Sequence, residues 1–144
     1  MNKLIKKTDF ENLDILPANM RLLTANQTVM LDQTRPQQYR IKNALECVKD
    51  QYDFCIIDNA PDINISTINA LTACNDVLIP VEIDDNTGEG LPELVNQIYH
   101  TQEDLNEDLE KYWVFITKYD KRNEAQRQGL EVIQAAGYPM LKTR

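Results

Sequence analysis

The chain has 144 residues, of which 42% are hydrophobic and 26% charged, which is the size and composition of one ordinary globular domain. Its formal net charge is −8, and basic side chains gather in 1–44 and 111–144, so only these ends are suited to contact a nucleic acid. No apolar run approaches a membrane span, and three scattered cysteines with one histidine argue against a zinc site. We therefore expect one cytoplasmic domain over 1–144, with its cysteines as small buried residues.

The first half of the chain alternates apolar runs with helix-period spacing. The stretch NLDILPA at 12–18 predicts a strand, and the apolar positions in 39–50 predict a helix with a single apolar face. The stretch YDFCIID at 52–58 predicts a second strand, and 66–74 predicts a short helix.

The second half continues the same alternation. Its predicted elements, in chain order, are a strand at 76–82, a helix that ends near Leu105, a strand at 112–120, a helix at 123–136 and a strand that begins at Pro139. Gly137 predicts a left-handed cap on the last of these helices.

Strands that alternate with helices at this spacing build a parallel sheet through right-handed crossovers, with helices on both faces. The continuous apolar run from Phe54 to Ile57 supports this arrangement, because strands of such a sheet are buried on both sides. The predicted fold class is therefore α/β with a mostly parallel sheet. Ligands of open α/β sheets bind beyond the carboxyl ends of the strands, where Asp58, Glu82 and Asp120 stand.

Asp58 is the first candidate for a functional residue. A hydrophobic strand that ends on an aspartate is the geometry of a Walker B site, whose carboxylate holds hydrated magnesium beside nucleotide phosphates. A buried strand that ends on a loop aspartate is also common, and these residues alone favour that structural role. Asp62 lacks a His, Lys or Tyr partner for acid/base chemistry, so we expect its charge to favour the following helix dipole.

The longer stretch 52–98 closely resembles the ParA family of chromosome- and plasmid-partitioning ATPases, relatives of MinD. The matching features are Tyr52–Asp53, the strand into Asp58, Pro61, Asn69–Ala70–Leu71, Ile79–Pro80–Val81 and Glu89–Gly90–Leu91. NLDILPA before this stretch and VFITKYDKR after it extend the resemblance over nearly the whole chain in family order.

The resemblance implies a P-loop NTPase-like fold, ATP and Mg²⁺ as cofactors, and a role in DNA segregation. It makes Asp58 the Walker B carboxylate, a catalytic and magnesium-holding residue, with Asn59 and Pro61 in the turn beside the nucleotide. Thr117 and Lys118 resemble the loop that contacts the adenine, and a solvated turn at the end of a strand is an equal alternative for them.

The chain also departs from the family pattern. The phosphate-loop signature G-x-x-x-x-G-K-[ST] does not occur in the sequence, and none of the four glycines is followed by a lysine. We therefore expect the middle of a ParA-type protein, without its head and tail, and little or no ATP hydrolysis by this chain alone, because the phosphate loop supplies most of the charge neutralisation.

The expected partners follow from the missing phosphate-loop strand and from the family resemblance. A run at 52–58 without the phosphate-loop strand beside it presents an unpaired apolar edge, so we expect self-association as a dimer, by swapping or by strand docking. The resemblance implies a partition partner protein and, in the full-length protein, non-specific DNA, with no membrane. The alternative function is a non-catalytic interaction or dimerisation module of the same fold.

Overall fold

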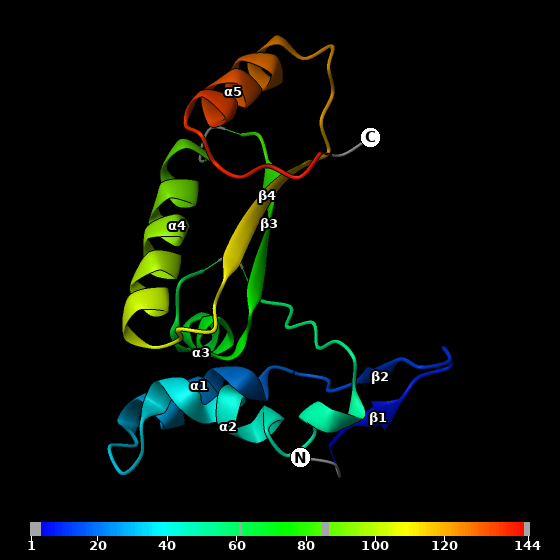
Figure 1. Cartoon of the computed structure of the whole chain (residues 1–144), viewed down its shortest axis with the longest axis vertical. Helices are drawn as coiled ribbons and strands as arrows, with labels where there is room; N and C mark the ends of the chain where they lie inside the picture. Colours follow the sequence, from blue (N-terminus) through cyan, green and yellow to red (C-terminus); the bar gives the residue numbers. More distant parts are fainter. Residues whose placement is uncertain (1–3, 61, 85–86, 143–144) are drawn as a thin grey trace. The chain divides into compact units, whose positions relative to one another are not determined.

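The computed structural model describes residues 4–60, 62–84 and 87–142 (Figure 1). The chain forms two compact units, Met1–Ala73 and Cys74–Arg144, and each is described by itself. The expectation of a single domain over 1–144 stays a prediction.

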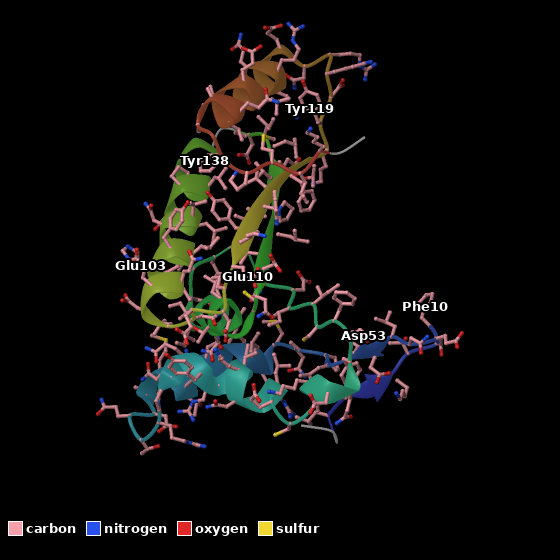
Figure 2. All side chains as sticks on the ribbon, viewed as in Figure 1. Phe10, Asp53, Glu103, Glu110, Tyr119 and Tyr138 are labelled. Carbon is pink, nitrogen blue, oxygen red and sulfur yellow. The ribbon has the colours of Figure 1, made fainter. Side chains whose placement is uncertain are left out.

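The first unit begins with a small antiparallel hairpin. Strand β1 (Lys6–Lys7) pairs with β2 (Asp14–Ile15), so that Lys6 lies opposite Ile15 and Lys7 opposite Asp14. The loop between the strands carries Phe10, which is exposed (Figure 2). The predicted strand at 12–18 is therefore confirmed only at its centre.

Three helices form the rest of the first unit, and helix α3 contacts each of the other two. They are α1 (Arg21–Leu31), α2 (Arg40–Leu45) and α3 (Ile65–Ala73), with short 3₁₀ turns at η1 (Gln37–Tyr39) and η2 (Lys49–Gln51). The helix predicted over 39–50 is thus divided into α2 and η2, and the helix predicted at 66–74 is confirmed. Helix α1 was not predicted, because its threonines and asparagine weaken the helical signal.

Asn69 is the main polar connection inside the first unit. Its side-chain oxygen accepts hydrogen bonds from the backbone N–H groups of Arg40 (2.8 Å) and Ile41 (3.2 Å), at the start of α2. Its amide group donates to the carbonyl oxygens of Gln37 and Ile65, each at 2.9 Å. Because the Asn69 residue is only 4% exposed, this one side chain satisfies backbone groups that water reaches poorly.

The segment between α1 and α2 is held by an aspartate. Asp32 accepts hydrogen bonds from the hydroxyl and the backbone N–H of Thr34, and its other carboxylate oxygen accepts one from Arg40 Nη2 at 2.6 Å. These hydrogen bonds lower the pKa of the Asp32 carboxyl to about 2. The bonds from Thr34 contribute most to this shift, and the bond from Arg40 comes next.

The predicted strand at 52–58 is wrong. Tyr52 donates a hydrogen bond to Asp14 Oδ2 (2.7 Å), but the residues that follow form no strand. Phe54 and Ile56 are 89% and 93% exposed. Cys55 and, earlier in the chain, Cys47, which we expected to be buried, are exposed as well. The physical reason is the lack of a partner in the described part of the chain, where β1 pairs with β2 and β3 pairs with β4.

The second unit is built on a parallel strand pair. Strand β3 (Asp76–Glu82) pairs with β4 (Lys111–Thr117) from Asp76 opposite Lys111 to Glu82 opposite Thr117, and helix α4 (Thr87–Asp104) connects them (Figure 1). Helix α5 (Glu124–Ala135) follows β4. The bounds of β3 and α5 and the end of α4 agree with the predicted elements, whereas β4 ends three residues before the predicted strand 112–120 does. The α/β class with a parallel sheet is confirmed.

The chain then returns to β4. Val114 N–H donates to the carbonyl of Pro139 (2.8 Å), and Leu141 N–H donates to the carbonyl of Val114 (2.9 Å), so Met140 forms a parallel bridge with Val114. Gly137 has a φ of 78°, as expected for a left-handed helix end.

The core of the second unit lies between the strand pair and the two helices. Its buried apolar residues are Ile79, Val81, Leu91, Val95, Ile98, Leu109, Val114 and Ile133. Helix α5 approaches the end of β3 so closely that a Cβ atom on Gly129 would overlap the Ile83 side chain. The unit is therefore tightly packed at the carboxyl ends of its strands.

Candidate functional site

The first group of candidate residues follows the apolar run of the first unit. Asp58 and Asn59 are exposed, and the Asn59 amide donates to the carbonyl of Ile57 (3.0 Å), which turns the chain directly after Asp58. Pro61 lies outside the described residues. The carboxylate of Asp58 is thus presented to solvent at the end of the run, although the run itself is not a paired strand.

The start of α3 lies just beyond this turn. Asn64 caps the helix, because its side-chain oxygen accepts from the backbone N–H of Ser66 (2.7 Å) and of Thr67 (3.3 Å). The Asn64 amide donates to Asp62 Oδ2 (2.6 Å), and the Thr67 hydroxyl donates to the carbonyl of Asp62 (2.6 Å). Asp62 therefore belongs to the structure of the helix start, where its charge favours the helix dipole.

The second group lies at the carboxyl ends of β3 and β4 in the second unit. The Thr117 hydroxyl donates to the carbonyl of Val81 (3.3 Å), and Lys118 Nζ forms an ion pair with Glu82 Oε2 at 2.6 Å. The hydrogen bond to Glu82 raises the pKa of Lys118. The side chains of Lys118 and Glu82 are 74% and 48% exposed, so their ion pair adds little stability. The Lys118 ammonium group can therefore exchange Glu82 for another anion.

The loop after Lys118 is ordered by its own hydrogen bonds. Asp120 receives two from the Arg122 guanidinium, each 3.0 Å long, and its backbone N–H donates to Gln126 Oε1 (2.8 Å). Hydrogen bonds from Arg122 lower the pKa of the Asp120 carboxyl. Asn123 then caps α5 through Gln126 N–H. The cap and the Asp120–Arg122 pair were not predicted, because they depend on the loop conformation.

The donor atoms fit part of a magnesium–nucleotide site. No cluster of three or more potential metal ligands occurs among the described residues. A single exposed carboxylate such as Asp58 holds a hydrated cation only when phosphates supply further oxygen ligands. Asp58 and Asn59 lie in the first unit and Thr117 and Lys118 in the second, and their roles stay predictions.

Among the helices in the described ranges, none has the length and apolar character of a membrane span.

Comparison with known proteins identifies the family. A family model described as an AAA domain matches residues 1–111 of this chain. The chain belongs to this AAA-domain family. The resemblance to ParA-type partitioning proteins is confirmed as well, because relatives of that name match most of the chain.

Two of these relatives are the sporulation initiation inhibitor protein Soj of Bacillus subtilis and the chromosome partitioning protein ParA of Caulobacter vibrioides. Soj is 41% identical over 131 residues, which are 91% of this chain and 50% of Soj. ParA is 34% identical over 131 residues, which are 90% of this chain and 48% of ParA. The chain therefore spans about half the length of these curated relatives.

A solved structure agrees with this placement. The crystal structure of cobyrinic acid a,c-diamide synthase from Mycobacterium smegmatis, with bound ATP analog and magnesium, superposes with a TM-score of 0.85. It is 28% identical, and the match covers 99% of this chain and 57% of that one. This agreement confirms the P-loop NTPase-like fold class.

Proposed function

We propose that this chain carries the Walker B half of a ParA-type DNA-partitioning ATPase, active in chromosome or plasmid segregation. One observation carries the proposal: Asp58 stands exposed at the end of the Phe54–Ile57 run, inside the stretch that matches the family model. Relatives named for chromosome partitioning support it. The alternative, a non-catalytic interaction module, is not favoured by these names.

Different candidate residues would contact different parts of Mg²⁺–ATP. The Asp58 carboxylate would hold hydrated magnesium, which neutralises charge on the phosphates, and the proposal assigns Asn59 and Pro61 to nucleotide binding through the family resemblance. Thr117 and Lys118 would contact the adenine end. The exposed position of the Lys118–Glu82 ion pair supports this role, because such a weak pair costs little to separate. A solved relative with a bound ATP analog and magnesium supports these cofactors for the family.

The chain alone is expected to hydrolyse little or no ATP, because its sequence contains no phosphate-loop signature. We include in the proposal self-association as a dimer, a partition partner protein, non-specific DNA binding by the full-length protein, and a cytoplasmic location. The partner protein and the DNA binding come from the resemblance, the cytoplasmic location comes from the composition and cysteine usage, and the exposed apolar run supports self-association.

Isothermal titration with a non-hydrolysable ATP analogue and magnesium tests the proposal directly. We expect micromolar binding that Asp58→Asn weakens at least about tenfold, or ~1.4 kcal/mol. Asp62→Asn is the matched control, since it removes an equal charge four residues away, and it should leave the affinity within about twofold.

Each outcome of this titration is decisive. If the unaltered chain does not bind the analogue, the interaction module is favoured. If Asp58→Asn and Asp62→Asn weaken binding equally, the effect of Asp58 is a general electrostatic one. Phosphate release from ATP, measured with malachite green, should stay at background. Turnover that Asp58→Asn abolishes would contradict our expectation that the chain is inactive alone.

A further inference from the structure

The segment that carries Asp58 is held neither by a strand nor by a core. Residues 53–60, which we call the Asp58 segment, form no strand, and no backbone–backbone hydrogen bond joins them to another element in the described part of the chain. Phe54 and Ile56 are 89% and 93% exposed, so packing does not fix these side chains either. The position of Asp58 therefore depends chiefly on how the two ends of the segment are attached.

Asp14 on β2 anchors the first end of the Asp58 segment. Its Oδ2 accepts a hydrogen bond from the Tyr52 hydroxyl at 2.7 Å, and the Asp14 side chain is only 10% exposed. Tyr52 directly precedes the segment, and its φ of −136° and ψ of 141° are those of an extended chain. This hydrogen bond therefore joins the hairpin to the segment at the point where the chain leaves η2.

The charge of the Asp14 carboxylate strengthens this anchor. Lys7 lies opposite Asp14 in the hairpin, and its Nζ is 2.8 Å from the same Oδ2. The hydrogen bond from Lys7, followed by that from Tyr52, lowers the pKa of Asp14, so the carboxylate is ionised at neutral pH. The hydrogen bond to Asp14 also raises the pKa of Tyr52, which stays a donor. A hydrogen bond to an ionised acceptor is stronger than one between neutral groups.

Helix α3 anchors the second end of the Asp58 segment. The Thr67 hydroxyl donates to the carbonyl of Asp62, and the Asn64 amide donates to Asp62 Oδ2, each at 2.6 Å. Thr67 is buried, so water competes little for its hydrogen bond. The segment is thus a short span attached at both ends, and release of the first end would let Asp58 occupy many more positions.

We propose that Asp14 is a positioning residue for Asp58: by holding the Tyr52 hydroxyl, it keeps the Asp58 segment in place, so that the Asp58 carboxylate is ready to bind hydrated magnesium. This inference rests on the proposed function, because it takes Asp58 as the residue that holds the magnesium of Mg²⁺–ATP. Asp14 contributes no ligand to the metal. It acts by reducing the conformational entropy that the segment loses when the nucleotide binds.

Two natural cysteines report on the anchor without any nucleotide. Cys55 lies in the Asp58 segment, Cys47 lies before η2, and both are exposed. Nitroxide labels on these two thiols, in a chain that carries Cys74→Ala, give a distribution of label distances by pulsed electron paramagnetic resonance. Tyr52→Phe keeps the ring and removes only the hydroxyl, so the fold should persist. We expect this substitution to broaden the distribution, because the segment is then attached at one end.

Titration with the non-hydrolysable ATP analogue and magnesium tests the link to Asp58. Tyr52→Phe and Asp14→Ala should each weaken binding at least about threefold. Asp14→Asn should weaken it less than Asp14→Ala, since an amide oxygen still accepts from the Tyr52 hydroxyl. In a chain that already carries Asp58→Asn, Tyr52→Phe should cost no more than about a further 1.5-fold, because the two residues act on the same step.

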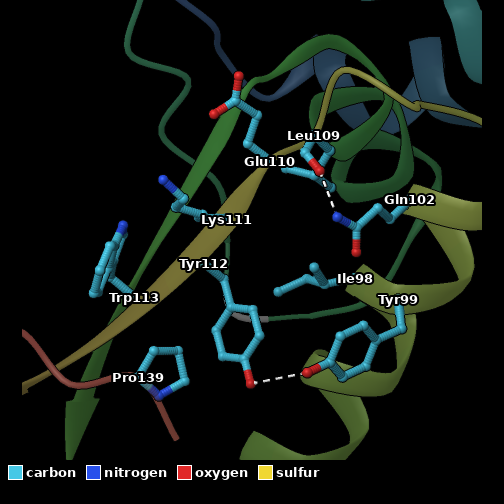
Figure 3. Close-up of a pocket in the computed structure, with 9 residues that line it drawn as sticks. All are labelled: Ile98, Tyr99, Gln102, Leu109, Glu110, Lys111, Tyr112, Trp113 and Pro139. Carbon is cyan, nitrogen blue, oxygen red and sulfur yellow. Dashed lines mark hydrogen bonds between the residues drawn. The ribbon is translucent and has the colours of Figure 1, made fainter.

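Tyr99→Phe is the matched control for both measurements. It removes a tyrosine hydroxyl that is also hydrogen-bonded, to the Tyr112 hydroxyl at 3.4 Å, but in the second unit (Figure 3). We expect Tyr99→Phe to leave the label distances unchanged and the affinity for the analogue within about 1.5-fold of the unaltered chain.

Three results would overturn the role of Asp14. Equal label distributions with and without the Tyr52 hydroxyl would show that Asp14 does not hold the segment. A broader distribution with unchanged affinity would show that the anchor does not position Asp58. An equal loss of affinity in the Asp58→Asn chain, or in Tyr99→Phe, would show an effect that does not act through Asp58.

Failure of the proposed function gives a different result. If the unaltered chain does not bind the analogue, the proposed function is wrong, and the role of Asp14 towards magnesium is wrong with it. That result appears before any substitution is made, whereas the three results above require a chain that binds.

Discussion

Replacement of Asn69 by alanine should destabilise the first unit more than any other single asparagine substitution in that unit. The side chain accepts from the N–H groups of Arg40 and Ile41 and donates to two carbonyl oxygens, and only 4% of the residue is exposed. An alanine leaves both N–H groups without an acceptor at the point where α2 begins. Each buried unsatisfied donor costs about 1–3 kcal/mol.

The two N–H groups are part-buried, so water replaces some of the lost bonding, and we expect a total of about 2–4 kcal/mol. This range is a loss of roughly 30- to 700-fold in the ratio of folded to unfolded protein. Urea unfolding followed by circular dichroism measures the loss. Amide hydrogen exchange locates it, because the Arg40 and Ile41 amides should lose protection first.

Asn59→Ala is the control for this experiment. Asn59 is exposed and its amide makes one local hydrogen bond, to the carbonyl of Ile57, so its loss should cost no more than about 0.5 kcal/mol. The reasoning is refuted if Asn69→Ala lowers the free energy of unfolding by no more than about 0.5 kcal/mol while the Arg40 and Ile41 amides stay protected from exchange.

Three further predictions concern other parts of the chain. Gly129→Ala should destabilise the second unit by about 1–3 kcal/mol in urea unfolding, since the new methyl overlaps Ile83, and equal or greater stability would show that α5 shifts freely. Asp32→Asn should reduce the loss of stability on acidification. The pKa of the Asp32 carboxyl is about 2 in the folded chain against an ordinary 3.8, so its contribution to the free energy of unfolding is fully present above pH 3.8 and is lost as the pH falls through 2. Exposed Cys55 should react with Ellman's reagent at neutral pH much faster than Cys74, whose thiol pKa burial raises to about 11; equal rates would contradict the described burial.

The sequence predicted the second unit far better than the first. The run Val77–Val81 and the helix after it carry strong local periodicity, and the partner strand of β3 is encoded a short distance along the same chain. The run Phe54–Ile57 has an equally strong strand signal but no partner among the described residues, so it stays unpaired and exposed. Local pattern specifies the tendency to form a strand, whereas hydrogen-bonded pairing needs a neighbour.

The candidate site shows the same limit. The position of Asp58 at the end of an apolar run was readable from the sequence, because it depends only on consecutive residues. The ion pair of Lys118 with Glu82 was not, because it depends on the register that sets Glu82 opposite Thr117. Asn69 was noticed as part of the family resemblance, and only the structure shows that it connects α3 to the start of α2.

Lys118 links the stability of the second unit to the proposed function. Its φ of 53° lies in the left-handed region, where a residue other than glycine costs roughly 1–2 kcal/mol. The exposed ion pair with Glu82 returns no more than about 1 kcal/mol of that cost. Glycine would suit this backbone better, so stability does not explain the lysine. An ammonium group held at the carboxyl ends of β3 and β4 by a weak, exchangeable carboxylate is instead suited to an anionic or polar ligand, which is the role that the nucleotide proposal gives it.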